Sequence, residues 1–93
     1  MAWFLHMGIA KEIYETDGIS KGVKYVLTIN EDDSVKLVFY NGAFKVEEPC
    51  VKIVDVGDNG GKRVEYGTSK VKTSLPFKRY IDGTLDDRWT KIL

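Results

Sequence analysis

The 93-residue sequence contains only one cysteine, Cys50, and only one histidine, His6. A single cysteine cannot close an intramolecular disulfide, and one Cys with one His cannot complete a structural zinc site. Neither residue has a partner that would orient it as a nucleophile or general base. We therefore expect no enzyme, no metal and no cofactor. Because Cys50 opens an apolar segment, we expect it to be a small buried side chain.

Neither sign of charge predominates, since 14 basic residues balance 14 acidic ones. This balance argues against a protein that coats nucleic acid by bulk electrostatics, and equally against an acidic mimic of DNA. Disorder requires low hydrophobicity and high net charge, whereas here 43% of residues are hydrophobic and 12% are aromatic. The composition is typical of one ordered domain over residues 1–93.

Long hydrophobic runs are also missing. The apolar stretch at residues 2–10 is too short to span a bilayer. It also lacks the basic start of a secretory signal. We therefore expect a cytoplasmic protein that does not contact the membrane, which also suits its single unpaired cysteine.

Residues 23–46 read as three extended segments joined by two turns. Apolar and polar residues alternate in 23–30 and in 35–40, as in strands with one buried face. The acidic turn 31–33 separates these segments. The pair Asn41–Gly42 is a strong hairpin signal, because a type I′ turn needs positive φ at both central residues. We predict an antiparallel β-meander here.

The second face of this meander is also partly apolar, because Val26, Val38 and Tyr40 lie on it. A sheet face of that kind is normally covered, here by the N-terminal helix or by another subunit. Further strands are predicted at 50–56, 62–66 and 69–73, with a glycine-rich loop at 57–61. The sequence Leu-Pro-Phe at 75–77 predicts a bend or crossing.

Two helices are predicted at the ends of the chain. In residues 2–16, apolar side chains recur every three or four positions and favour a helix, with a buried strand as the alternative. In residues 84–93, Thr84 suits an N-cap and the acids after it suit the first turn, with a final strand as the alternative. The fold class is therefore α+β. One mostly antiparallel sheet of about five or six strands, open or barrel-like, carries an N-terminal helix and a short C-terminal helix.

Charge is unevenly distributed along the chain. Residues 1–59 carry 6 basic and 10 acidic side chains, and residues 60–93 carry 8 basic and 4 acidic ones. Basic and aromatic side chains are interleaved in the second part, and such groups contact anionic ligands. The predicted ligand-binding residues are Lys62, Arg63, Tyr66, Lys70, Lys72, Lys78, Arg79 and Tyr80. In the alternative interpretation, these lysines only keep an exposed sheet edge soluble.

These features predict a small non-enzymatic binding or inhibitor protein, of the kind found as accessory proteins of phages and mobile elements. It would sequester a partner protein or a small phosphorylated ligand such as a nucleotide. The alternative is a barrel of the OB or SH3-like kind that binds single-stranded nucleic acid through the same residues. The opposed acidic and basic regions also predict a homo-oligomer.

Overall fold

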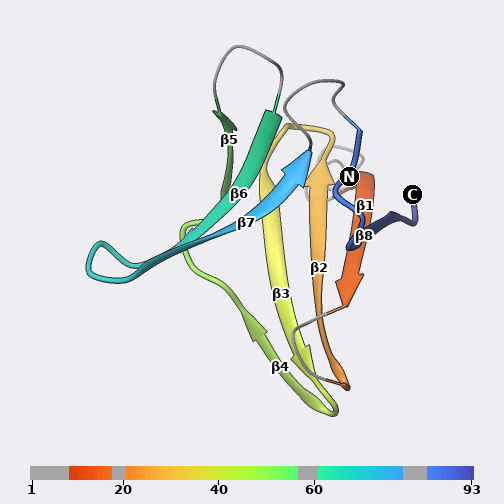
Figure 1. Cartoon of the computed structure of the whole chain (residues 1–93), viewed down its shortest axis with the longest axis vertical. Coiled ribbons are helices and arrows are strands. Elements are labelled where there is room, and N and C mark those ends of the chain that lie inside the picture. The colour runs from red at the N-terminus through yellow and green to blue at the C-terminus, as the bar shows by residue number, and fades with distance from the viewer. Residues whose placement is uncertain (1–8, 18–20, 57–60, 79–83) are drawn as a thin grey trace, which may run out of the picture.

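The computed structural model describes residues 9–17, 21–56, 61–78 and 84–93, which form eight strands in two antiparallel sheets (Figure 1). Sheet A contains β1 (Ala10–Asp17), β2 (Val23–Asn30), β3 (Val35–Asn41), β4 (Phe44–Glu47) and β8 (Trp89–Lys91), in the order β4-β3-β2-β1-β8. Sheet B contains β5 (Lys52–Val56), β6 (Gly61–Gly67) and β7 (Lys72–Lys78), in the order β5-β6-β7. The predicted single sheet is therefore wrong, because the chain leaves sheet A after β4 and builds a second layer.

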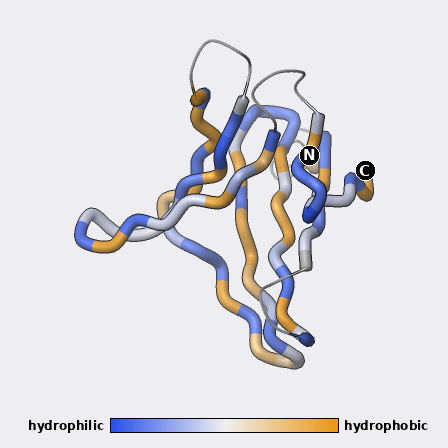
Figure 2. The backbone as a smooth tube through the Cα atoms, in the orientation of Figure 1, coloured by the Kyte–Doolittle hydropathy of each residue, from blue (hydrophilic) through white to orange (hydrophobic). Residues whose placement is uncertain are grey.

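The predicted meander over residues 23–46 is present as β2, β3 and β4. Figure 2 shows apolar stretches through the middle of both β2 and β3. The turn itself differs from the prediction, because Asn41 pairs with Phe44 and the two loop residues are Gly42 and Ala43. Gly42 has φ 61°, and positive φ at the first loop residue is typical of a type II′ hairpin. The Asn-Gly signal thus placed the hairpin correctly but its turn one residue too early.

The core lies between the two sheets. Sheet A contributes Tyr14, Leu27, Leu37 and Trp89, and sheet B contributes Val64, Tyr66 and Phe77. The Phe77 ring meets those of Tyr14 and Trp89 edge to face, with centroids 4.9 and 5.4 Å away. Edge-to-face pairs are a favourable aromatic geometry. Aromatic packing across the layers therefore holds the sheets together.

The predicted N-terminal helix is wrong over the part of residues 2–16 that the structure describes. That part lies in β1, which pairs with β2 along most of its length. Tyr14 and Thr16 are buried while Ile13 lies on the other face, so the observed period is two. Pairing of seven β1 residues with β2 and burial of Tyr14 stabilise the strand. These tertiary interactions are stronger than the local preference for a helix that the apolar spacing indicates. Residues 1–8 lie outside the described residues.

The predicted C-terminal helix is also wrong, and the alternative strand is present as β8. The Asp86 carboxylate accepts hydrogen bonds from the Arg88 backbone N–H and Nε, at 3.1 and 3.0 Å, and so forms a turn. Trp89 enters the core, and its Nε1 donates to the Pro76 carbonyl at 2.7 Å. Ile92 and Leu93 are exposed instead of sharing a helical face. None of the described residues belongs to a helix of the length and apolarity that crossing a membrane requires.

Three smaller predictions about residues 50–77 are corrected. Cys50 is exposed rather than buried, and the strand after it begins at Lys52. The predicted strand at 69–73 is mostly the β6–β7 turn. The predicted bend at 75–77 is part of β7. β7 can contain Pro76 because it lies at the edge of sheet B, where a missing N–H breaks no ladder.

Replacing Gly67 with alanine should destabilise the fold by about 2–4 kcal/mol, since two sources of strain combine. Gly67 has φ 120°, and a Cβ there would lie 2.2 Å from the Val71 carbonyl oxygen. Gly42→Ala is the matched control. Its φ is also positive, but no atom lies within 4 Å of the added Cβ. Urea denaturation should show a clearly larger loss for Gly67→Ala, and equal losses would contradict the steric account.

Candidate ligand-binding cleft

The structure separates the residues predicted to bind a ligand. Lys62 and Lys78 are direct cross-strand partners on the face of sheet B that meets sheet A. Arg63 lies on the opposite face, where its Nε and Nη2 donate to Ser74 Oγ at 3.1 and 2.8 Å. Tyr66 is buried in the core, and its hydroxyl lies 3.2 Å from that of Tyr25. Arg79 and Tyr80 lie outside the described residues.

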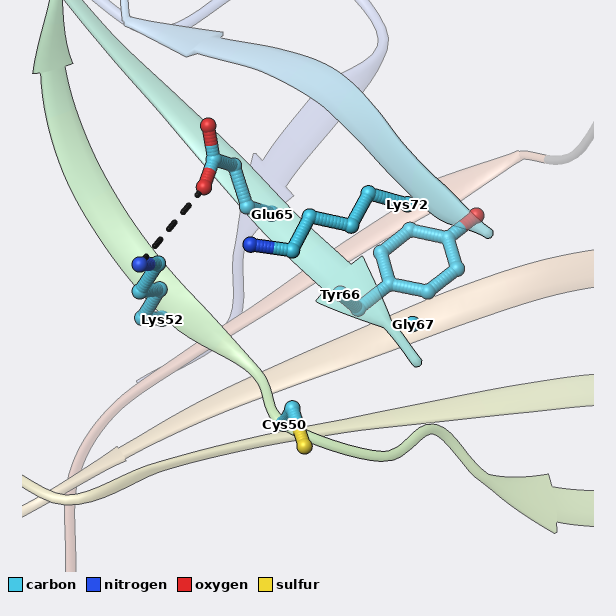
Figure 3. A pocket seen from close by; sticks show the side chains of 6 residues that line it. All are labelled: Cys50, Lys52, Glu65, Tyr66, Gly67 and Lys72. Carbon is cyan, nitrogen blue, oxygen red and sulfur yellow. Dashed lines mark ion pairs between the residues drawn. The ribbon is translucent and has the colours of Figure 1, made fainter. Parts of the chain in front are cut away.

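The two remaining predicted lysines lie elsewhere. Lys70 is exposed in the β6–β7 turn, so it does not share a strand face with Lys72. Lys72 lines a hollow of about 130 Å³ on the outer face of sheet B. Figure 3 shows the amino groups of Lys72 and Lys52 on the same side of β6 as the Glu65 carboxylate, with Cys50 at the hollow's lower edge. Lys52 Nζ lies 3.9 Å from Glu65 Oε1, so this hollow already contains a paired charge.

A larger hollow opens between the two sheets, where the β2–β3 turn faces sheet B. We call it the cleft, and its volume is about 680 Å³, within the usual size range of small-molecule sites. Its apolar lining is Ile29, Val35, Val51, Ile53 and Phe77. Its polar lining is Lys11, Glu12, Asp33, Ser34, Lys52, Lys62 and Lys78. An apolar interior beside Lys11, Lys62 and Lys78 suits a ligand that has both an apolar part and a negative charge, while the Lys52 amino group is directed to Glu65 on the outer face of sheet B.

A register shift in each sheet directs side chains toward this cleft. In sheet B, Lys62 pairs with Lys78 but Arg63 pairs with Pro76, so Phe77 is an extra residue in β7. Consecutive strand residues normally point to opposite faces, but a bulge lets both face the same way. Phe77 and Lys78 accordingly both line the cleft.

Sheet A repeats this arrangement. Ala10 pairs with Asn30 and Glu12 pairs with Ile29, which leaves Lys11 as the extra residue of β1. Lys11 and Glu12 both line the cleft. The cleft thus lies between two irregular strands, one from each layer, and each contributes a lysine. Bulges that redirect a side chain are common beside functional sites.

The cleft lysines differ in how far their charge is already paired. Lys11 Nζ lies 2.7 Å from Asp33 Oδ1, and Lys62 donates to Asp55. Lys78 makes no ion pair with a described residue, and its Nζ lies 5.6 Å from the centroid of the Phe77 ring. Lys78 is only partly exposed, so its charge is screened less than that of a fully solvated lysine. It is the cleft cation best placed to take up a ligand anion.

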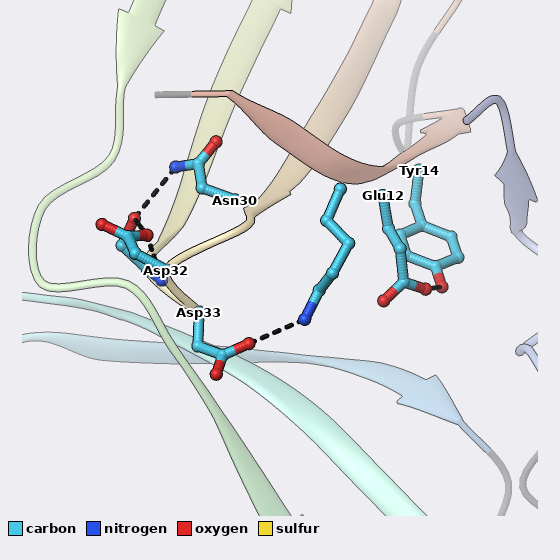
Figure 4. A network of polar contacts seen from close by, with 7 residues as sticks. Glu12, Tyr14, Asn30, Asp32 and Asp33 are labelled. Carbon is cyan, nitrogen blue, oxygen red and sulfur yellow. Dashed lines mark hydrogen bonds and ion pairs between the residues drawn. The ribbon is translucent and has the colours of Figure 1, made fainter. Parts of the chain in front are cut away.

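The Glu12 carboxylate lines the same cleft as this lysine. Figure 4 shows its side chain beside that of Tyr14, whose hydroxyl donates a hydrogen bond to it. That bond, together with the positive charges of Lys91 and Lys78, lowers the pKa of Glu12. Burial and the Glu12 carboxylate raise the pKa of Tyr14 to about 12. Glu12 therefore stays ionised, and its direct partners are the Tyr14 hydroxyl and the Lys91 amino group, whereas Lys78 makes no ion pair with it.

Sequence reasoning found two cleft lysines, Lys62 and Lys78, and missed Lys11 and Lys52. No local signal identifies Lys11, because it enters the site only when the two sheets pack, whereas Lys52 lies on β5 of the same sheet as Lys62 and Lys78. Among the described residues, no group of three or more His, Cys, Asp or Glu side chains is arranged to hold a metal ion. Comparison with protein-family models, with curated proteins and with solved structures finds no match.

Proposed function

We propose that this protein binds a small phosphorylated molecule, of about the size of a nucleotide, in the cleft and sequesters it without chemical conversion. The observation that carries the proposal is the pair of register shifts, which bring Lys11 and Lys78 from different sheets to one apolar hollow. Regular strands would alternate these side chains away from the cleft. Such irregularity is expected where side-chain direction matters to function.

A phosphate group matches the chemistry of the cleft. Lysine binds phosphate as a compact point charge, and charge-assisted bonds are stronger than neutral ones. Lys62 and Lys78 oppose each other directly, and two like charges at such a position repel. A bound dianion would relieve that repulsion. The aliphatic side chains of Ile29, Val35 and Ile53 would contact the apolar part of the ligand.

The alternative of single-stranded nucleic-acid binding has less support. It requires exposed aromatic faces on which bases stack. Tyr66 and Phe77 are both buried in the core. The described basic residues of the second half also lie on different faces, with Arg63 on the side of sheet B away from the cleft. A small ligand that fits one hollow needs neither a continuous basic track nor a stacking surface.

Replacing Lys78 with alanine should weaken binding of nucleoside monophosphates about tenfold or more, because a hydrogen bond to a charged group is lost. Titrations by calorimetry and by amide NMR shifts would use adenosine monophosphate and its three counterparts. Adenosine and inorganic phosphate are the comparison ligands. Adenosine has the base and sugar but no phosphate, and inorganic phosphate has the negative charge but no apolar part. Shifts should centre on residues 29, 53, 77 and 78.

Lys70→Ala is the matched control, because it removes the same charge from the exposed turn and leaves the cleft intact. It should change affinity very little. Equal losses for Lys70→Ala and Lys78→Ala would show non-specific attraction to a basic region. Absence of any shift in the cleft with all four nucleotides would reject the proposed ligand class.

A further inference from the structure

The outer edge of β4 has no strand paired to it among the described residues, because β4 ends sheet A. All four of its residues are exposed, and Phe44 and Val46 keep 60% and 37% of their surface accessible. In Figure 1, β4 and the adjoining ends of β2 and β3 extend beyond sheet B. An accessible edge strand with apolar side chains is a template for pairing with another strand.

The hydrogen-bond pattern shows which β4 groups face this free edge. The Glu48 N–H donates to the Leu37 carbonyl at 2.8 Å, so the pair formed by these residues is hydrogen-bonded. Bonded and non-bonded pairs alternate along an antiparallel ladder. Phe44 and Val46 therefore direct their backbone groups toward β3. Lys45 and Glu47 direct theirs outward.

We propose that two copies of this chain pair through β4 in antiparallel fashion, about a twofold axis at Val46, and extend sheet A across the dimer. In this register Lys45 of one copy lies opposite Glu47 of the other, and the twofold axis repeats the contact. Both residues carry outward-facing backbone groups, so each such pair can form two hydrogen bonds. Opposite charges directly across strands are favourable.

The neighbouring registers are unfavourable. Only residues with outward-facing backbone groups can form hydrogen bonds between the two β4 strands, so one strand can shift along the other only in steps of two residues. A shift in one direction places Lys45 against Lys45 of the second copy. A shift the other way places Glu47 against Glu47 and Lys45 against Pro49, which has no N–H to donate. Like charges opposed across strands are destabilising. The order Lys-Val-Glu in β4 is therefore complementary to itself in one register.

The apolar face of the strand is consistent with this pairing. Val46 would meet Val46 of the second copy as a non-hydrogen-bonded pair, in which side chains approach most closely. Val46 pairs with Phe39 on the core-facing side of sheet A, and the centroids of the Phe39 and Tyr25 rings are 5.3 Å apart. The exposed Phe44 and Val46 would thus extend an apolar surface that already exists. The edge strand β7, by contrast, is blocked by Pro76 and flanked by Lys72 and Lys78.

Charge variants test the register directly. Lys45→Glu and Glu47→Lys should each raise the dimer dissociation constant about tenfold or more, because both symmetric contacts become repulsive. A mixture of the two variants should form a heterodimer, and the double exchange Lys45→Glu/Glu47→Lys should restore the homodimer. Sedimentation equilibrium and native mass spectrometry report these states. Lys36→Glu is the matched control, since it makes the same charge change on β3 away from the β4 edge.

All of these positions are exposed, so the variants should fold as the unmodified protein does. Recovery of dimer in the mixture and in the double exchange is the result expected. A protein that remains monomeric at every concentration would overturn the proposal. So would single variants that dimerise as well as the Lys36→Glu control. The outcome is independent of nucleotide binding, because β4 contributes no residue to the cleft.

Discussion

Phe77→Ala is expected to lower the free energy of unfolding by about 3–5 kcal/mol, the usual range for removing a buried phenyl ring. Phe77 is 1% exposed and contacts the rings of Tyr14 and Trp89 from the opposite sheet. A domain of this size is stabilised by about 5–15 kcal/mol in total. The substitution would thus remove a large part of the energy that holds sheet B on sheet A.

Phe44→Ala is the matched control, because it removes the same side chain from a position that is 60% exposed. Its effect should stay within about 0.5 kcal/mol when urea denaturation is measured at low protein concentration. Phe77→Leu keeps most of the apolar volume and should lose less than the alanine variant, so the series can be measured even if Phe77→Ala unfolds. Equal losses at positions 44 and 77 would contradict the core described above.

The sequence predicted turns better than it predicted the layers that they join. The acidic turn before Val35 and the Gly42 hairpin depend on local backbone chemistry, so they could be found from a few residues. The choice between helix and strand in β1 depended on pairing with β2, whose residues lie 7 to 20 positions away in the chain from the β1 residues they pair with. Ile13 and Tyr14 are adjacent apolar residues, a pattern that fits one side of a helix or both faces of a covered strand.

The site was predictable only in part, for a related reason. Lys62 and Lys78 belong to one hairpin, so their closeness follows from local pairing. Lys11 comes from the first strand of sheet A, and only the packing of the two sheets brings it to the cleft. The extra residue Phe77 could not be foreseen from the sequence either, because Leu-Pro-Phe reads as a break in the strand. The same residues can form a bulge in a proline-containing edge strand or a bend between strands, so composition alone does not distinguish these two structures.

Alkaline pH is expected to destabilise the protein steeply through two buried tyrosines. Burial, with a contribution from Glu12, raises the pKa of Tyr14 to about 12 from its ordinary value of 10.0. Burial and the hydrogen bond with Tyr25 also raise the pKa of Tyr66. Each hydroxyl thus keeps its proton in the folded state after the unfolded chain has lost it. Stability is therefore complete below pH 10 and falls as the pH rises above it.

The slope should be about 1.4 kcal/mol per pH unit for each tyrosine, so Tyr14 alone accounts for about 2.7 kcal/mol between pH 10 and its folded pKa. Urea denaturation at a series of pH values, with tyrosinate absorbance recorded in parallel, measures the loss. Tyr14→Phe and Tyr66→Phe should each make the loss of stability with pH less steep by the contribution of one tyrosine. Lysines titrate in the same range, but their contribution cancels when a variant is compared with the unmodified protein. Parallel pH profiles for all three proteins would mean that both hydroxyls ionise in the folded state as easily as in water, which is incompatible with a Tyr14 side chain sealed between Glu12 and Phe77.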